Sequence, residues 1–255
     1  MSKLPKKYRF VDLSDYGRPA GKKIAYYLTS TSVTPIHITL LFLSCGILAT
    51  ICVLYQYYWT AAALLVLKSI LDAADGELAR MKETPSYTGR YLDSISDMVL
   101  NILLIATIWY VTEGSVVYAI LAIIGLQLQG TLYNYYYVIL RNRFHGDTTS
   151  RIFEKEAPKA MAGEKQQYVT LLFKIYRFFY GPFDKIIYLL DSKAVSGKEF
   201  PKWFMTAVSC FGLGFQLLII GGMLAFDLKD HIIPFFIGYS FFIFIFINLR
   251  RFLNR

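Results

Sequence analysis

Four aspartates stand close together in the sequence between residues 71 and 100: Asp72, Asp75, Asp93 and Asp97. Apolar segments of membrane-spanning length run into this stretch and out of it. Ionised carboxylates at the edge of a bilayer core are energetically costly, so such residues are more often functional than incidental. The four aspartates are therefore the first candidates for a functional site.

The spacing of the aspartates predicts that they meet. If both flanking segments are helical, Asp72 and Asp75 share one helix face, because residues three and four apart lie above one another. Asp93 and Asp97 form a second stripe by the same rule. Pro85 can turn the chain between the segments, since proline disfavours helix for the residue before it. The two stripes can then face each other across a helical hairpin.

Four converging carboxylates need positive counter-charge, because each ionised carboxylate that is buried without a partner costs several kcal/mol. Two divalent cations would neutralise them. Residues 71–100 contain no His and no Cys, so the available ligands are hard oxygen atoms. This favours Mg²⁺ or Mn²⁺, and allows Ca²⁺, over zinc or copper. Two such ions side by side form the usual clamp for in-line displacement at phosphorus.

The pattern around the aspartates resembles the signature of the CDP-alcohol phosphotransferase family. That signature is D-x-x-D-G-x-x-A-R, a gap of eight residues, and then G-x-x-x-D-x-x-x-D. The gap from Met81 to Thr88 has the same length here, and every fixed position is present. The matching residues are Asp72, Asp75, Gly76, Ala79, Arg80, Gly89, Asp93 and Asp97. The signature covers residues 72–97, and the membrane layout described below extends the resemblance more loosely to most of the chain.

The resemblance implies a metal-dependent enzyme of phospholipid synthesis. It would transfer a substituted phosphoryl group from a CDP-linked donor, with CDP-diacylglycerol expected, to an alcohol and release CMP. By the same resemblance, Asp72, Asp75 and Asp93 are the main ligands of two Mg²⁺ or Mn²⁺ ions. Asp97 is the last ligand of the set and the general base that accepts the proton of the alcohol. The resemblance also implies a homodimer. Asp72 lies eight residues before Arg80, or about 12 Å inside the end of its predicted helix, and this depth implies that at least one substrate is a lipid.

The other residues of the signature would contact the nucleotide. Gly76 and Gly89 would let the cytidine nucleotide approach the backbone, since glycine has no side chain. Ala79 shares the helix face of Gly76 and the first two aspartates. Arg80 would hold a phosphate of the donor.

Three polar residues near the aspartates are not among the fixed residues of the signature. Lys68 precedes Asp72 by four residues, so it either pairs with that carboxylate as a helical neighbour or contacts a substrate phosphate. Asn101 follows Asp97 by four residues and either orients it by a hydrogen bond or faces another helix. Glu77 points away from the aspartates on an ideal helix, so we expect it to be solvated or structural.

The composition points to a membrane protein. Of the 255 residues, 55% are hydrophobic and 17% aromatic, and the mean hydropathy is +0.42, which excludes an ordinary soluble domain. Each transmembrane helix needs about 20 apolar residues. We predict an all-α integral membrane protein, a single domain over residues 1–255, with six transmembrane helices. Their approximate ranges are 33–55, 59–80, 89–111, 116–140, 202–226 and 231–249.

Two basic segments accompany the predicted spans. Residues 1–32 contain seven Lys and Arg and no apolar core like that of a cleaved signal peptide. Within them, residues 16–28 form either an amphipathic helix in the membrane interface or a solvated basic leader, and we predict the helix. Residues 141–201 connect two spans and contain eleven Lys and Arg, which either bind anionic lipid or nucleotide phosphates or mark the cytoplasmic side. Residues 167–191 within them are amphipathic, and we expect one or two interfacial helices with a break at Gly181-Pro182.

The distribution of basic residues predicts the orientation in the membrane. All Lys and Arg except Lys68 and Lys229 lie in the N-terminal segment, the turn near residues 80–90, residues 141–202 or the C-terminal tail. The positive-inside rule then places both termini and the aspartate hairpin on the cytoplasmic side. We interpret the net charge of +9 as a membrane-surface charge rather than a nucleic-acid footprint. The three cysteines fall within predicted spans and indicate neither a disulfide framework nor a zinc site.

Other kinds of membrane protein also place aspartates within spans. An intramembrane prenyltransferase would show two separated aspartate motifs, and a cation transporter gives no reason for G-x-x-A-R and the fixed gap. A structural membrane protein has no use for four converging carboxylates. Within the resembled family, an enzyme that uses CDP-choline or CDP-ethanolamine on a lipid alcohol is the alternative. The acceptor stays open among glycerol 3-phosphate, inositol or its phosphate, serine and a second lipid.

Overall fold

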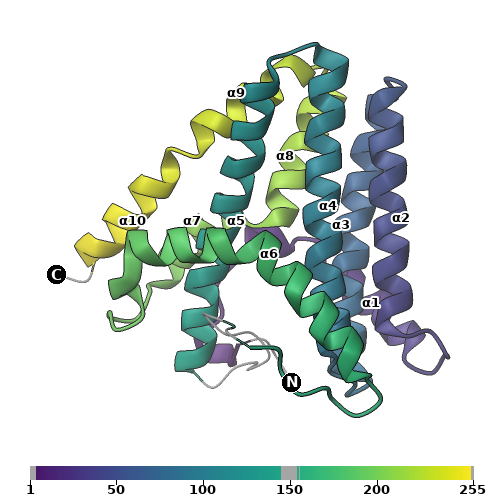
Figure 1. The fold of residues 1–255 in the computed structure, drawn as a ribbon, viewed down its shortest axis with the longest axis vertical. Helices are drawn as coiled ribbons and strands as arrows, with labels where there is room; N and C mark the ends of the chain where they lie inside the picture. Colours follow the sequence, from purple (N-terminus) through teal and green to yellow (C-terminus); the bar gives the residue numbers. More distant parts are fainter. Residues whose placement is uncertain (1–3, 145–153, 155, 254–255) are drawn as a thin grey trace.

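The structure is a computed structural model that describes residues 4–144, 154 and 156–253. Within these residues the regular structure is helical throughout, which confirms the predicted all-α class (Figure 1). The first five α-helices are α1 (Arg18–Leu28), α2 (Pro35–Leu54), α3 (Tyr58–Met81), α4 (Tyr87–Thr112) and α5 (Val116–Arg143). The remaining five are α6 (Gln166–Asp191), α7 (Lys202–Val208), α8 (Leu213–Ala225), α9 (Lys229–Tyr239) and α10 (Phe242–Leu253).

Several of the predicted spans are present as long apolar helices. In the described part of the chain, α2, α4, α5 and the continuous stretch of α9 and α10 are each long and apolar enough to cross a membrane. The stretch of α7 and α8 makes a fifth if it counts as one span, although it bends by 52°. Helix α3 is long enough, but its C-terminal half carries the charged residues of the signature. Six spans therefore stay a prediction.

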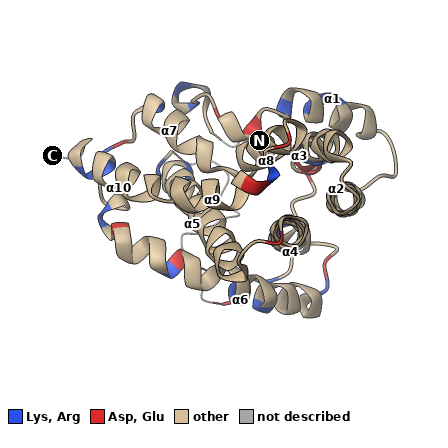
Figure 2. Cartoon of the chain, turned by 90° about the horizontal axis from the view of Figure 1, so that it is seen from above, with Lys and Arg blue, Asp and Glu red and all other residues tan. Residues whose placement is uncertain are grey.

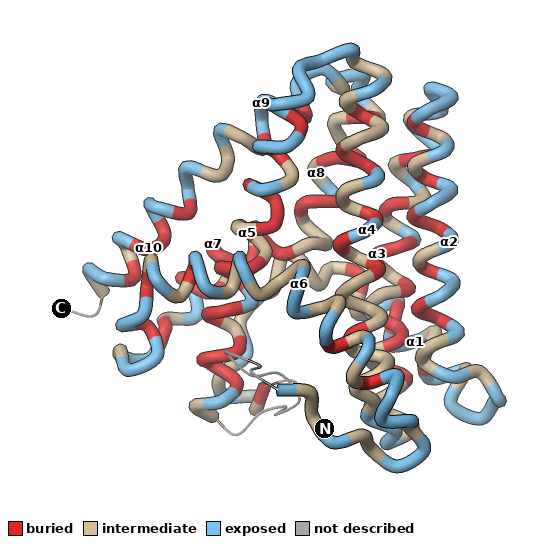
Figure 3. The backbone as a smooth tube through the Cα atoms, in the orientation of Figure 1, coloured by how far each residue is buried: buried red, intermediate tan, exposed pale blue. Residues whose placement is uncertain are grey.

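Helix α3 lies inside a group of helices rather than on the surface of the fold. Helices α1, α2 and α8 pack against it, and Figure 3 shows buried positions where these helices face one another. Phe42 of α2, Leu71 and Leu78 of α3 and Leu100 of α4 belong to one buried apolar cluster. This cluster holds α2 against both signature helices, in the part of each that carries the aspartates.

The loop into α2 is stabilised by local capping. Thr34 Oγ1 accepts a hydrogen bond from the backbone N–H of His37, and His37 Nδ1 accepts one from the backbone N–H of Thr34. Pro35 occupies the first position of the helix, where its missing N–H is not needed. His37 therefore has a structural role at the start of this helix.

Helix α1 lies directly on α3, within the segment for which a helix was predicted. A Cβ atom at Gly17 would lie 3.0 Å from Cα of Ile70, and one at Gly21 would lie 2.9 Å from the backbone N of Ala74. The absence of side chains at these two positions lets the backbones approach beside the aspartates. Whether α1 lies in the membrane interface stays a prediction.

Helix α6 crosses the N-terminal half of α4 and continues as one helix through Pro182, although it changes direction along its length (Figure 1). The predicted break at Gly181-Pro182 is therefore wrong, and the segment forms one helix. Its C-terminal end is anchored by a buried carboxylate, because Asp191 accepts hydrogen bonds from Arg250 Nε (2.8 Å) and from the Tyr136 hydroxyl (2.7 Å). These tertiary contacts and a solvent-exposed Pro182 allow the helix to continue past a residue that lacks one N–H donor.

Candidate active site

Three of the four aspartates meet between α3 and α4. One carboxylate oxygen each of Asp72, Asp75 and Asp93 lies within 4.8 Å of the other two; we call these residues the aspartate triad. Seen along the helices, α3 carries acidic residues on the side that faces α4 (Figure 2). Ser86 caps the start of α4 by accepting a hydrogen bond of 2.8 Å from the backbone N–H of Gly89. The hairpin deduced from the spacing thus brings three carboxylates together.

Asp97 lies outside the triad and contacts a lysine instead. Its Oδ1 atom accepts a hydrogen bond of 2.5 Å from Lys68 Nζ, which also donates one of 2.9 Å to Asp72 Oδ2. Lys68 is only 2% exposed. The pairing of Lys68 with Asp72 agrees with one of the two sequence-based interpretations. The contact with Asp97 joins residues 29 positions apart on two helices, and no sequence pattern indicated it.

The aspartate triad fits a hard divalent cation. Its donor atoms are all carboxylate oxygens, the ligand type that Mg²⁺ and Mn²⁺ prefer. Asp93 Oδ1 is buried and, among the described residues, has no hydrogen-bond partner. A buried acceptor without a partner is costly, and a bound cation would satisfy it. Asp75 Oδ2 accepts a hydrogen bond of 2.8 Å from Thr39 Oγ1, and this contact orients one ligand from α2.

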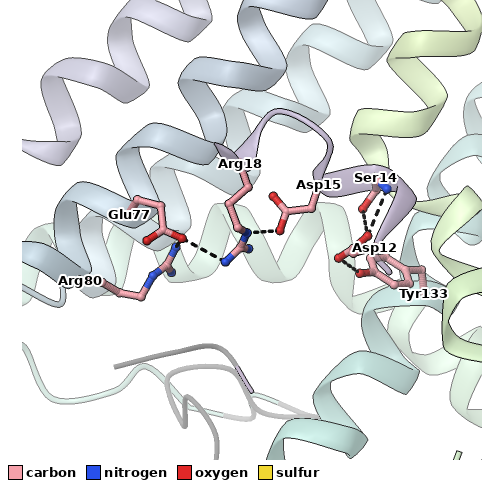
Figure 4. Close-up of polar contacts among 7 residues, drawn as sticks. All are labelled: Asp12, Ser14, Asp15, Arg18, Glu77, Arg80 and Tyr133. Atoms are coloured by element: carbon pink, nitrogen blue, oxygen red, sulfur yellow. Dashed lines mark hydrogen bonds and ion pairs between the residues drawn. The ribbon is translucent and has the colours of Figure 1, made fainter. Parts of the chain in front are cut away.

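A network of charged residues extends from the signature to the N-terminal segment (Figure 4). Glu77 Oε1 forms an ion pair with Arg80 (2.9 Å) and accepts a hydrogen bond from Arg18 of α1 (3.0 Å). Arg18 also pairs with Asp15. Burial alone would lower the pKa of Arg18, but Asp15 and Glu77 outweigh it and hold that pKa above its ordinary value. Glu77 is therefore structural, and Arg18 is a neighbour of the signature that the sequence did not reveal.

Packing within the described part of the chain does not explain why the two signature positions are glycine. A Cβ atom at Gly76 would first meet the guanidinium nitrogens of Arg80 at 3.5 Å, an ordinary contact distance. At Gly89 it would meet Ser86 Oγ at 3.3 Å, which is only slightly tight. Ala79, which lies between these two glycines in the sequence, is partly exposed. The atoms nearest to both glycine positions thus belong to side chains and not to the backbone.

Asn101 lies near the lysine contact. Together with Lys68 and Asp97 it lines a small space of about 10 Å³ that is enclosed by α2, α3, α4 and α8. A space of this size approaches that of a single water molecule. A much larger groove of about 570 Å³ lies apart from the aspartates, along α6, where its lining includes Phe173, Lys174 and Arg177.

Helix α6 and the loop before it support the second half of the signature. Glu164 accepts hydrogen bonds from Ser86 Oγ (2.8 Å) and from the backbone N–H of Thr88 (2.6 Å). The Tyr180 hydroxyl donates a hydrogen bond of 2.7 Å to the backbone carbonyl of Ser94. These contacts hold α4 on the side away from α3. The sequence indicated an amphipathic segment here, but not its contact with the signature.

Comparison with known proteins agrees with this site. Residues 32–192 match the model of the CDP-alcohol phosphatidyltransferase family. The chain is 29% identical, over 147 residues, to the bifunctional IPC transferase and DIPP synthase of Thermococcus kodakarensis. The aligned residues make up 57% of this chain and 33% of that protein. The chain thus spans about a third of the length of this relative. Because the family model covers more than half of the chain, including every signature residue, the protein belongs to the CDP-alcohol phosphatidyltransferase family.

Proposed function

We propose that this protein transfers a substituted phosphoryl group from a CDP-linked donor, with CDP-diacylglycerol expected, to the hydroxyl of an alcohol. CMP is released, and the reaction serves phospholipid synthesis. The observation that carries this proposal is the convergence of the aspartate triad within 4.8 Å in a chain of this family. Its all-oxygen donor set suits the divalent cations that assist displacement at phosphorus.

The aspartate triad would hold Mg²⁺ or Mn²⁺, in two ions by the family resemblance. When bound, these ions neutralise the diphosphate and the charge that develops on the departing CMP. Thr39 keeps the Asp75 carboxylate oriented through its hydrogen bond. The nucleotide would approach the backbone at Gly76 and Gly89, where there is no side chain.

Asp97 would take the proton during the transfer. The oxygen of the acceptor alcohol forms a bond to the phosphorus of the transferred group, its proton passes to the Asp97 carboxylate, and the bond to the CMP oxygen breaks. Asp97 Oδ1 is held by Lys68, so Oδ2 is the atom that would accept the proton. Positioned general bases of this kind contribute about 10²- to 10⁴-fold to rates.

Arg80 would orient a phosphate of the donor. Its side chain is 20% exposed and pairs with Glu77, which also contacts Arg18. A guanidinium offers five N–H donors, so an ion pair with one carboxylate leaves donors for a phosphate. Glu77 would thus restrict Arg80 to a conformation that can bind the donor.

The membrane supplies the setting for a lipid substrate. By the positive-inside rule, the aspartates and both termini would lie on the cytoplasmic side. Exposed apolar side chains on α6, including Leu171 and Phe178, alternate with Lys174 and Arg177, which is typical of a helix in the membrane interface. A homodimer is expected from the family.

Assaying CMP release tests this function and separates it from the alternatives. CDP-diacylglycerol, CDP-choline and CDP-ethanolamine would each be tried with glycerol 3-phosphate, inositol, inositol phosphate, serine and a lipid alcohol. The substrates of the Thermococcus relative belong in the same panel. We expect CMP release to require Mg²⁺ or Mn²⁺, to stop in excess EDTA, and to be absent in Asp75→Asn.

Two results would contradict the proposal. Full turnover after the metal has been stripped with EDTA would exclude the metal-dependent mechanism. No CMP release from any donor, together with aspartate-dependent cation flux in proteoliposomes, would favour the transporter alternative.

A further inference from the structure

The ammonium group of Lys68 lies where three helices meet. It contacts Asp72 Oδ2 of its own helix α3 at 2.9 Å and Asp97 Oδ1 of α4 at 2.5 Å. It also lies 4.6 Å from the centre of the Phe42 ring of α2. A single buried cation therefore joins both helices of the signature and their neighbour.

The position of Lys68 divides the four aspartates into two groups. Asp72, Asp75 and Asp93 form the triad, whereas Asp97 is paired with the lysine and lies outside it. Without a nearby cation, four carboxylates in a membrane-embedded site would repel one another, and each would pay an unrelieved desolvation penalty. A lysine supplies one fixed positive charge that no chelator removes.

The burial of Lys68 argues against contact with a substrate phosphate. An ammonium group has three donors, and carboxylates take two of them while the Phe42 ring covers the group at cation–π distance. The side chain is 2% exposed. No donor of Lys68 therefore faces the open side of the site where the nucleotide would lie.

We infer that Lys68 is a built-in counter-cation that ties α3 to α4 and keeps Asp97 apart from the metal-binding carboxylates. This inference rests on the proposed function only in the role given to Asp97. Lys68 is a positioning residue: it occupies Oδ1 of Asp97, leaves Oδ2 for the acceptor hydroxyl, and prevents Asp97 from joining the triad as a fourth metal ligand. It also shares Asp72 with the metal and so limits metal affinity.

Replacing Lys68 by methionine separates these effects. Lys68→Met keeps the length of the side chain and removes the charge, while Lys68→Arg retains the charge. Lys23→Met is the matched control, because Lys23 is exposed on α1 and has no part in the site. Thermal unfolding of the purified protein would be measured in EDTA and in Mg²⁺, together with kcat and KM for the CDP donor.

We expect Lys68→Met to unfold at a lower temperature than the wild type in EDTA. Its unfolding temperature should rise more on addition of Mg²⁺ than that of the wild type, because Asp72 and Asp97 are then free to bind the metal. Its kcat should fall by about 10²-fold, on the scale of a misplaced general base, with little change in KM for the donor. Lys68→Arg should recover part of the stability in EDTA. Lys23→Met should match the wild type in both conditions.

A double variant keeps the inference testable even if Lys68→Met is too unstable for kinetics. Asp97→Asn combined with Lys68→Met removes both charges, so it should be more stable in EDTA than Lys68→Met alone, as expected for directly coupled residues. Equal stability of the single and double variants would overturn the inference. So would a Lys68→Met enzyme with wild-type kcat, wild-type stability in EDTA and a raised KM, since that pattern indicates a substrate contact. The unfolding measurements need no turnover, so their outcome is independent of whether the proposed reaction is correct.

Discussion

The hydroxyl of Thr39 donates a hydrogen bond of 2.8 Å to Oδ2 of Asp75. Thr39 belongs to α2 and is 2% exposed, so the bond ties a helix outside the signature to the aspartate triad. Groups that hydrogen-bond to a metal ligand fix its direction and are nearly as important as the ligand itself. The candidate metal site would therefore depend on packing between α2 and α3 as well as on the signature.

Thr39→Val tests this dependence, because it removes the hydroxyl at nearly constant volume. We expect the apparent affinity for Mg²⁺ to fall by about 10-fold, the lower end of such outer-shell effects. Thr39→Ser keeps the donor and should remain close to the wild type. Mg²⁺ titrations of CMP release and of thermal stability would measure both variants, and an unchanged Mg²⁺ dependence in Thr39→Val would show that the bond does not orient the ligand.

Asp97→Asn and Asp75→Asn should separate proton transfer from metal binding. Asp97 lies outside the aspartate triad, so Asp97→Asn should still bind the CDP donor in a metal-dependent way but lose turnover by about 10²-fold or more. Asp75→Asn should lose both, since Asp75 is a member of the triad. Direct binding of a CDP-lipid with and without Mg²⁺ would distinguish them. Near wild-type turnover by Asp97→Asn would mean that another group accepts the proton.

Asp184 of α6 should make stability depend on pH. Burial and the nearby Glu154 raise the pKa of Asp184 to about 7, partly offset by Arg90, from an ordinary value of 3.8. The folded protein therefore keeps this proton at pH values where the unfolded chain has lost it. By linkage, this group lowers stability as pH rises from about 4 to about 7, and the loss is complete above that range.

Asp184→Asn mimics the protonated carboxyl and should remove this contribution. We expect the variant to unfold at a higher temperature than the wild type at pH 8 and to differ little from it near pH 4. Asp227→Asn is a suitable control, because the Asp227 side chain is 77% exposed. Thermal unfolding across this pH range would decide the matter, and parallel curves for the wild type and Asp184→Asn would refute the raised pKa.

The predicted topology can be tested with single cysteines in a background without Cys45, Cys52 and Cys210. A cysteine at Lys159 should resist a membrane-impermeant reagent added outside intact cells, because residues 141–201 are predicted to be cytoplasmic. A cysteine at Glu113, in the exposed turn between α4 and α5, should react. The reverse pattern would show that the orientation is inverted.

The sequence by itself determined the features that depend on spacing within one helix. The intervals between Asp72 and Asp75, and between Lys68 and Asp72, put these side chains on one face because the helix repeats every 3.6 residues. Pro85 marked the turn before α4, and the next residue, Ser86, caps that helix. Composition and apolar runs were enough for the all-α class. The number of spans was harder to predict from the sequence, because the charges of the signature lower the hydropathy of α3.

The tertiary structure decided which side chains meet between helices. Only the packing of α2, α3 and α4 places Lys68 against Asp97 and Thr39 against Asp75. Helical spacing predicted that all four aspartates converge, whereas the structure groups three of them and pairs Asp97 with Lys68. The contact of Arg18 with Glu77 likewise depends on how closely α1 approaches α3. Such contacts follow from the relative rotation and separation of helices distant in sequence. Local periodicity carries no information about those quantities.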